Sequence, residues 1–108
     1  METKQYIEVL KRRTKEPISV AMRQAVCFYL YSENIPCHII AEVMGCTRRL
    51  VYMSIYRVRD LLEVGDSVMK ASVEERKSHQ ICIRPYTIDG MVITRHAGYK
   101  MIIDNIIY

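Results

Sequence analysis

The sequence predicts a mainly α-helical fold of five helices, with a helix-turn-helix near the middle and a C-terminal β-hairpin extension. Three observations support this fold class. Apolar residues recur at helical three- and four-residue steps through residues 1–80, glycine interrupts that pattern at Gly45 and Gly65, and β-branched residues prevail from Ile81 onward. At 108 residues, the chain is divided into a helix-turn-helix domain at 1–80 and an extension at 81–108.

Two helices are expected before the helix-turn-helix. The first covers residues 3–13, and a basic loop, RRTKEP, follows at residues 12–17. Pro17 suits the first turn of the second helix, where a missing N–H is no loss. That helix runs from about Ile18 to Ser32 and is apolar nearly all round, which is typical of a helix buried at the centre of a bundle.

Three further helices are expected after the central one. Asn34 can cap a short helix that ends at Gly45, the residue best able to adopt a positive φ. Thr47 is a natural N-cap for a long helix over residues 48–64. The fifth helix is expected over SVMKASVEERKSH, residues 67–79.

The long helix is predicted to have two different faces. Ile55 and Val58 fall within about 40° of Val51 at roughly 100° per residue, which gives a complete stripe for the core. The opposite side carries arginine, tyrosine and methionine, and could enter a major groove. The side chains expected to contact bases there are Arg48, Arg49, Tyr52, Met53 and Tyr56.

The pattern I-A-x-x-M-G-x-T-x-x-L-V-x-x-x-I, from Ile40 to Ile55, has the spacing of a helix-turn-helix. A plain helical hairpin with incidental arginines is the alternative. The basic loop favours DNA because long cations can follow phosphates, and the outer face has no acidic residue before Asp60. The residues expected to contact phosphates are Lys11, Arg12, Arg13, Lys15, Arg23 and Thr47.

The extension begins with a predicted β-hairpin at about residues 81–96. Its two runs, ICIRPYTI and MVITRH, are separated by Asp89 and Gly90, a strong signal for a two-residue turn. Pro85 restricts its strand to the edge of a sheet. The tail over residues 97–108 fits a helix by its isoleucine spacing and a strand by its β-branching. The extension is expected to pack on the helices or to form a homodimer.

At these residues the chain resembles the C-terminal DNA-binding domain of the bacterial replication initiator DnaA. The resemblance covers roughly residues 4–80 and rests on KRRTK, MRQAVCFYL, IIAEVMG and CTRRLVYMSIYRVRDLL. It implies a Trp-repressor-like helical fold and a role in DNA replication or transcription regulation. It also implies that Arg12, Arg13 and Lys15 of the basic loop contact the backbone and minor groove.

The chain departs from that family at the residues that contact bases. The family's signature, Gly-Gly-Arg-Asp-His-Thr-Thr, aligns with residues 45–51, where this chain has Gly-Cys-Thr-Arg-Arg-Leu-Val. Recognition of the family's origin boxes is therefore not implied, and arginines here favour guanine O6 and N7, or phosphate. The chain lacks a G-x-x-x-x-G-K-[ST] loop, so no nucleotide ligand is expected.

The composition permits a nucleic-acid partner without requiring one, since the net charge is +4 and the pI about 8.9. The first hypothesis is a small cytoplasmic protein that binds double-stranded DNA, as a regulator or as an accessory factor in replication or mobile-element biology. The alternative is a protein–protein interaction module that keeps the helix-turn-helix fold without DNA, with a homodimer through residues 81–108.

Neither enzyme activity nor a cofactor is expected. The histidines, His38, His79 and His96, lie in no nucleophile motif. His79 and Cys82 are three residues apart, but no second half-site at ligand spacing accompanies them, so no metal is expected. The N-terminal sequence lacks the apolar run of a signal peptide, and the longest apolar run, AVCFYLY, is far shorter than the ~20 residues that span a membrane.

Overall fold

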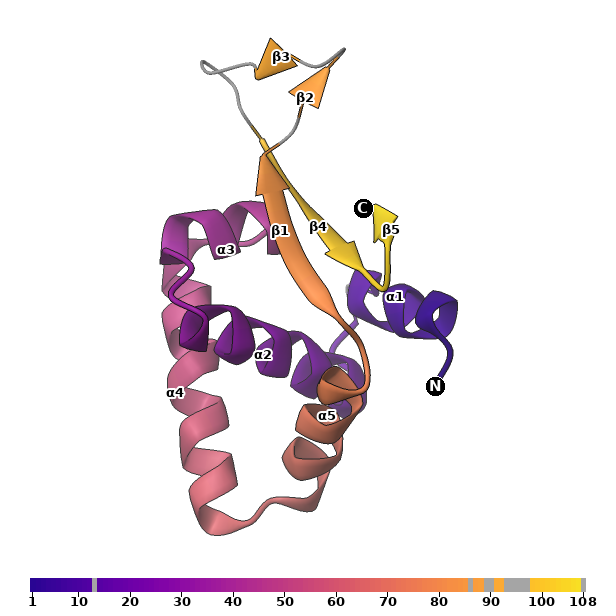
Figure 1. The fold of residues 1–108 in the computed structure, drawn as a ribbon. Coiled ribbons are helices and arrows are strands. Elements are labelled where there is room, and N and C mark those ends of the chain that lie inside the picture. Colours follow the sequence, from indigo (N-terminus) through magenta and orange to yellow (C-terminus); the bar gives the residue numbers. More distant parts are fainter. Residues whose placement is uncertain (13, 86, 89–90, 93–97, 108) are drawn as a thin grey trace.

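The computed structural model describes residues 1–12, 14–85, 87–88, 91–92 and 98–107. Within these residues the five predicted helices are all present, and the mainly helical fold class is confirmed (Figure 1). The helices are α1 Thr3–Lys11, α2 Pro17–Ser32, α3 Cys37–Met44, α4 Arg48–Val64 and α5 Ser67–Lys77. None of these described helices has both the length and the hydropathy needed to cross a membrane.

Helix α2 lies at the centre of the helical part and packs against the other four helices (Figure 1). Pro17 occupies its first turn, as predicted. Val26 and Leu30 are exposed by only 0% and 2%, and burying a side chain of this size contributes about 1.5–3 kcal/mol. The nearly continuous apolar sequence of α2 is thus explained, because neighbouring helices cover it on several sides.

Two predicted capping residues fix where α3 ends and α4 begins. Gly45 has a φ of 67°, a left-handed conformation that glycine adopts without strain. Thr47 Oγ1 accepts a hydrogen bond from the Leu50 N–H at 3.2 Å, as an N-cap side chain does. Both predictions are confirmed. The short turn between α3 and α4 follows from them.

The prediction that Asn34 caps α3 is wrong. Asn34 has a φ of 65° and ends α2 instead, while the Ile35 N–H bonds to the Leu30 carbonyl at 3.1 Å. This is the long-range bond of a Schellman motif, in which the left-handed residue is usually glycine and sometimes asparagine. The position before α3 is taken by Pro36, which supplies no side-chain cap.

The extension forms antiparallel strands, so the predicted hairpin is confirmed. The strands are β1 Ile81–Pro85, β2 Thr87–Ile88, β3 Met91–Val92, β4 Tyr99–Ile103 and β5 Ile106–Ile107. Strands β2 and β3 pair on either side of Asp89 and Gly90, which lie outside the described residues. Strand β1 pairs with β4 in a sheet of order β1-β4-β5, so the hairpin extends past the expected limit at residue 96. Pro85 lies in an edge strand, as predicted.

The C-terminal tail adopts a strand conformation, which decides between the two alternatives that its sequence allows. Asp104 and Asn105 have φ values of 48° and 70°, and Ile103 pairs with Ile106 across them. Two successive left-handed residues are what a type I′ hairpin turn requires. Aspartate and asparagine are among the few non-glycine residues that adopt this conformation readily, so the turn favours β4 and β5 over a helix.

The strands pack on the helical domain through one face. Ile81, Met101 and Ile103 are buried and belong to the same apolar cluster as Tyr6 of α1 and Ile40 of α3. Side chains alternate between the two faces of a strand, so the residues between these buried ones lie on the outer face. Helices and extension therefore share one core.

A polar cluster also connects the extension with the first and last helices. His79, which follows α5, is 5% exposed and stacks on Tyr6 of α1 with ring centroids 4.4 Å apart. Its Nδ1 contacts a carboxylate oxygen of Asp104, and its Nε2 lies 3.3 Å from Glu75 Oε1. Thr3 of α1 donates a hydrogen bond to Asp104 at 2.7 Å. His79 is thus held by carboxylates, whereas Cys82 is an exposed free thiol.

Asp104 is the centre of this cluster. Burial raises its pKa, but hydrogen bonds from His79, from the Gln80 N–H at 2.7 Å and from Thr3 outweigh burial and hold the pKa below its ordinary value. A carboxyl group with a lower pKa in the folded state contributes stability above its ordinary pKa of about 3.9. That contribution is lost as the pH falls through the folded value, so the cluster is expected to weaken in acid.

The change Asp104→Asn tests this cluster, because asparagine keeps the left-handed turn and removes the charge. We expect the free energy of unfolding at neutral pH to fall by about 1.5–3 kcal/mol, the range for hydrogen bonds to a charged group. The variant should also lose less stability than the wild type between about pH 5 and about pH 3. Urea denaturation measures both effects, and equal stability of the two proteins at neutral pH would contradict the assigned role.

Candidate nucleic-acid interface

Helix α4 buries one face and exposes the other, as predicted. Val51, Ile55 and Val58 have exposed fractions of 0%, 4% and 0%. On the other side Met53 and Tyr56 are exposed by 57% and 60%. The remaining predicted base-contacting side chains, Arg48, Arg49 and Tyr52, are also exposed.

The first turn of α4 concentrates positive charge. It contains Arg48 and Arg49 and no acidic residue. The N-terminal end of a helix carries a partial positive charge, so cations are unfavourable there and anions are favourable. Among the residues that the structure describes, neither arginine forms an ion pair with a carboxylate. An anion from another molecule is the group that would relieve this repulsion.

The two tyrosines on the exposed face are held differently. Tyr52 forms a hydrogen bond with Cys37 at the start of α3, which raises the pKa of the Tyr52 hydroxyl. The Arg59 guanidinium lies over the Tyr56 ring, with its carbon 5.9 Å from the ring centroid, which is within the range of a cation–π contact. Arg59 was not among the predicted contact residues, although its position three residues after Tyr56 places the two side by side on a helix.

A groove of about 460 Å³ lies between the basic loop, α2 and the start of α4. Lys15 and Arg23 line it together with Leu50 of α4. It therefore brings two of the predicted phosphate-contacting residues beside the predicted recognition helix. Leu50, which is 49% exposed, was not among the predicted site residues. The sequence carries no signal for the groove, because its walls come from segments far apart in the chain.

Arg23 holds the basic loop in place. Its guanidinium donates hydrogen bonds to the Arg12 carbonyl and to the Thr14 carbonyl, the second at 3.0 Å. The loop is thus attached to α2 by Arg23, a side chain that was expected to contact a phosphate. Arg12 lies 3.7 Å from Glu16, an exposed pair of the kind that contributes little to stability. A stronger anion could displace such a partner.

The change Arg23→Ala is expected to release the basic loop. Because the loop contains several trypsin sites, we expect cleavage within residues 11–15 to become several-fold faster, while the helices stay intact by circular dichroism. Arg23→Lys is the matched control for charge, since an ammonium group lacks the forked geometry that reaches two carbonyls. The two variants should be cleaved faster than the wild type, and unchanged cleavage of Arg23→Ala would contradict this role.

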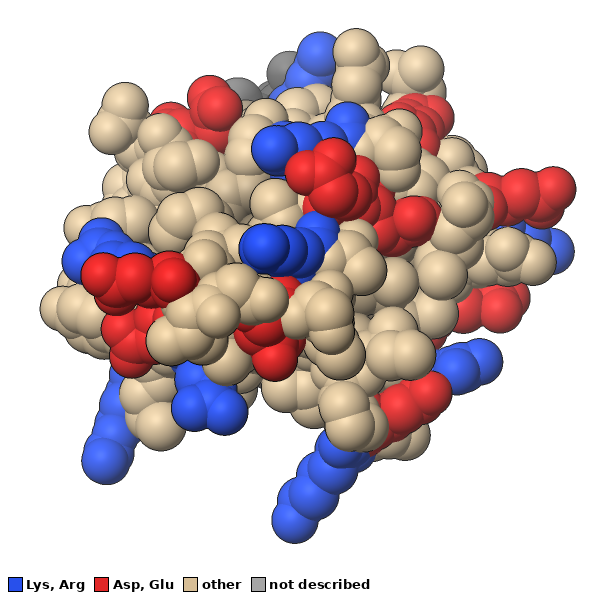
Figure 2. Space-filling view, turned by 90° about the horizontal axis from the view of Figure 1, so that it is seen from below, with Lys and Arg blue, Asp and Glu red and all other residues tan. Residues whose placement is uncertain are grey.

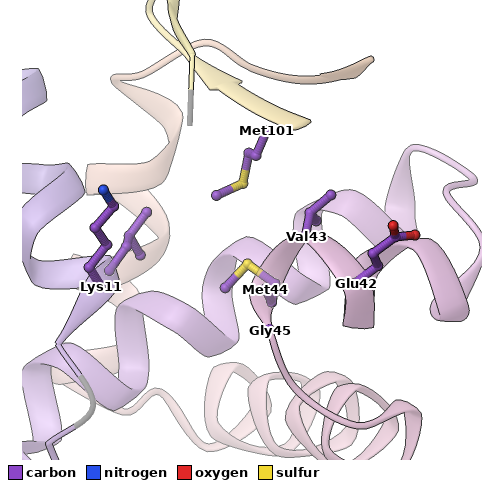
Figure 3. A pocket seen from close by; sticks show the side chains of 7 residues that line it. Lys11, Glu42, Val43, Met44, Gly45 and Met101 are labelled. Atoms are coloured by element: carbon purple, nitrogen blue, oxygen red, sulfur yellow. The ribbon is translucent and has the colours of Figure 1, made fainter. Parts of the chain in front are cut away.

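Lys11 lies apart from the groove. It lines a smaller cavity of about 200 Å³ between the end of α1, the end of α3 and β4, into which Met44 and Met101 project (Figure 3). Gly45 lines this cavity, Cys46 lines the groove, and Met44 lines both. The predicted phosphate-contacting residues therefore line two adjoining hollows, Lys11 the cavity and Lys15 with Arg23 the groove. Arg13 lies outside the described residues.

The far end of α4 has mixed charge. Seen from below, basic and acidic side chains alternate over the surface (Figure 2). The last turns of α4 contribute exposed Asp60 and Glu63 to this part of the molecule. The beginning of α4, which carries Arg48 and Arg49 before any acidic residue, is thus the end of the helix suited to a polyanion.

Comparisons with known proteins identified no relative of this chain. The chain matches no protein-family model, no curated protein and no solved structure. Its likeness to the DNA-binding domain of DnaA, and with it the Trp-repressor-like fold, stays a prediction from the quoted motifs.

Proposed function

We propose that this chain is a small protein that binds double-stranded DNA in the cytoplasm, with the start of α4 in the major groove. The observation that carries the proposal is the pair Arg48 and Arg49. Both are exposed at the positive end of a helix, in a turn without acidic residues. DNA phosphates and guanine O6 and N7 are the groups that such arginines bind.

The surroundings of the pair support the same partner. Tyr52, Met53 and Tyr56 continue the exposed face along α4, where they could contact base edges and thymine methyl groups. Lys15 lines the groove beside the first turns of α4, and its proposed role is to contact a phosphate. Arg23 acts by positioning the loop that contains Lys15.

The biological role that fits best is that of a bacterial transcription regulator, or of an accessory factor in replication or mobile-element biology. The likeness of the motif helices to the DNA-binding domain of DnaA supports this role. Residues 45–51 differ from the base-contacting signature of that family, which supports a DNA target other than the family's origin boxes.

Selection from random duplexes at two salt concentrations tests the proposal. The wild type should enrich a motif at low salt, and its affinity should fall steeply as salt rises, because phosphate contacts release counterions. The double change Arg48→Ala and Arg49→Ala should abolish the preference for that motif. Each good base contact is worth about 1–3 kcal/mol, so affinity for the selected duplex should fall at least about tenfold.

A double change at exposed lysines on other helices, Lys4→Ala and Lys70→Ala, is the matched control, because it removes the same charge away from the first turn of α4. It should keep the preference for the selected motif. Since all four side chains are exposed, both double variants should unfold at the wild-type temperature. Unchanged sequence preference in the α4 variant would move the interface elsewhere.

The second candidate is a protein–protein interaction module, and the apolar part of the same face favours it. Leu50, Met53 and Tyr56 are each about half exposed or more, at 49%, 57% and 60%. Exposed aromatic and apolar groups of this kind are typical of interface cores. A module of this type, or a homodimer through residues 81–108, would bind with little dependence on salt, whereas DNA binding would depend on it strongly.

A further inference from the structure

The groove between the basic loop, α2 and α4 has the size and composition of a small-molecule site. Its volume of about 460 Å³ falls within the range of roughly 300–1,000 Å³ that is usual for ligand pockets. Such pockets are lined mainly by apolar side chains, with a few polar groups that fix the orientation of the ligand. The groove combines both kinds of side chain, which come from the loop, α2, the α3–α4 turn and α4.

The apolar part of the groove is rich in sulfur. Val20 and Cys27 of α2 line it together with Met44 and Leu50. Burial raises the pKa of the Cys27 thiol to about 12, so this thiol is neutral at physiological pH and behaves as a small apolar group. Met44 also lines the neighbouring cavity (Figure 3), so its unbranched side chain has room to move when a ligand enters. Because sulfur makes favourable contacts with aromatic rings, this part of the groove favours a ligand with an aromatic body.

The charged part of the groove is positive. Lys15 and Arg23 line it, and the described lining residues include no aspartate or glutamate. Arg23 directs its guanidinium to the carbonyls of the loop. Lys15 is exposed and forms no hydrogen bond or ion pair with any residue that the structure describes. Its ammonium group is therefore available to an anion from another molecule at the edge of an apolar groove.

The number of available charges indicates which anion fits. Because Arg23 is bonded to carbonyls, Lys15 is the cation in the groove that can turn toward a ligand. One ammonium group matches the single charge of a carboxylate. A phosphate monoester carries a charge of about −1.5 to −2 at neutral pH and would stay partly uncompensated there. The groove therefore favours a carboxylate.

We propose that the groove is an effector site for a small aromatic carboxylate, whose ring packs against Cys27 and Met44 and whose carboxylate binds Lys15. The regulatory part of this proposal rests on the proposed function, in which Lys15 contacts a phosphate beside α4. A carboxylate on Lys15 would occupy that cation and place a negative charge near the duplex, so the ligand should weaken DNA binding. Coupling between two ligands is reciprocal, so DNA should weaken binding of the carboxylate by the same factor.

Titration of the isotope-labelled protein with 1-naphthoate, in the absence of DNA, tests the site itself. At the ligand efficiency usual for small molecules, its about 13 non-hydrogen atoms give a dissociation constant on the order of 1 mM. The amide signals that shift should be those of residues that line the groove. Acetate, which has the charge without the ring, should cause no such shifts. Absence of binding by 1-naphthoate at millimolar concentrations would show that the groove is not this site.

Two variants separate the charged part of the groove from the apolar part. Lys15→Met keeps a long side chain without the charge and should weaken 1-naphthoate binding about tenfold, as loss of a charged hydrogen bond does. Leu50→Ala should weaken it several-fold through lost contact area. Lys4→Met on α1, an exposed lysine outside the groove, is the matched control and should bind as the wild type does. Equal binding by Lys15→Met and the wild type would contradict the assigned carboxylate contact.

The regulatory effect is measured on the selected duplex. Saturating 1-naphthoate should lower the affinity of the wild type about tenfold, a typical coupling between two sites, whereas acetate at the same ionic strength should change it little. Lys15→Met should lose this response. If 1-naphthoate binds the groove and leaves the affinity for DNA unchanged, the effector role is wrong while the proposal for α4 stands. If the wild type binds no duplex, the proposed function is wrong, and the titration without DNA still decides whether the groove binds the carboxylate.

Discussion

The rotation of α4 about its own axis is the constraint on which the candidate site depends. Val51, Ile55 and Val58 are almost completely buried, and Gly45 and Thr47 fix the point at which the helix starts. Because successive residues on a helix differ by about 100°, a shift of one position would expose a core residue and bury part of the opposite face. Burial of the stripe therefore decides which side chains reach solvent. For that reason the arginines of the first turn and the tyrosines that follow them along α4 are exposed together.

Much of the fold could be predicted because its signals are local. The helical spacing of α2 and α4, the glycine at 45 and the threonine cap at 47 each act within a few residues, and all of them agree with the structure. The Asn34 prediction failed because asparagine serves equally well at the start of one helix and at the end of another. The tail could have been assigned from Asp104 and Asn105 between isoleucine pairs, a turn signal that the competing helical spacing of those isoleucines concealed.

The parts that the sequence could not predict come from residues far apart in the chain. The bond between Thr3 and Asp104 joins positions 101 residues apart, and the groove beside α4 draws its walls from the basic loop, α2, the end of α3 with the turn after it, and α4. The position of Arg23 shows the same limit. Its charge was apparent in the sequence, but its attachment to the loop carbonyls depends on where the loop lies.

The most direct test of the central claim is a titration of isotope-labelled protein with a selected duplex, followed by the amide signals of every residue at two salt concentrations. If the start of α4 binds DNA, the largest changes fall at residues 47–56 of the turn and α4, with smaller changes in the loop before α2, and all of them diminish as salt is raised. Changes restricted to α5, or changes on α4 that persist unaltered at high salt, would contradict the claim that the start of α4 binds DNA.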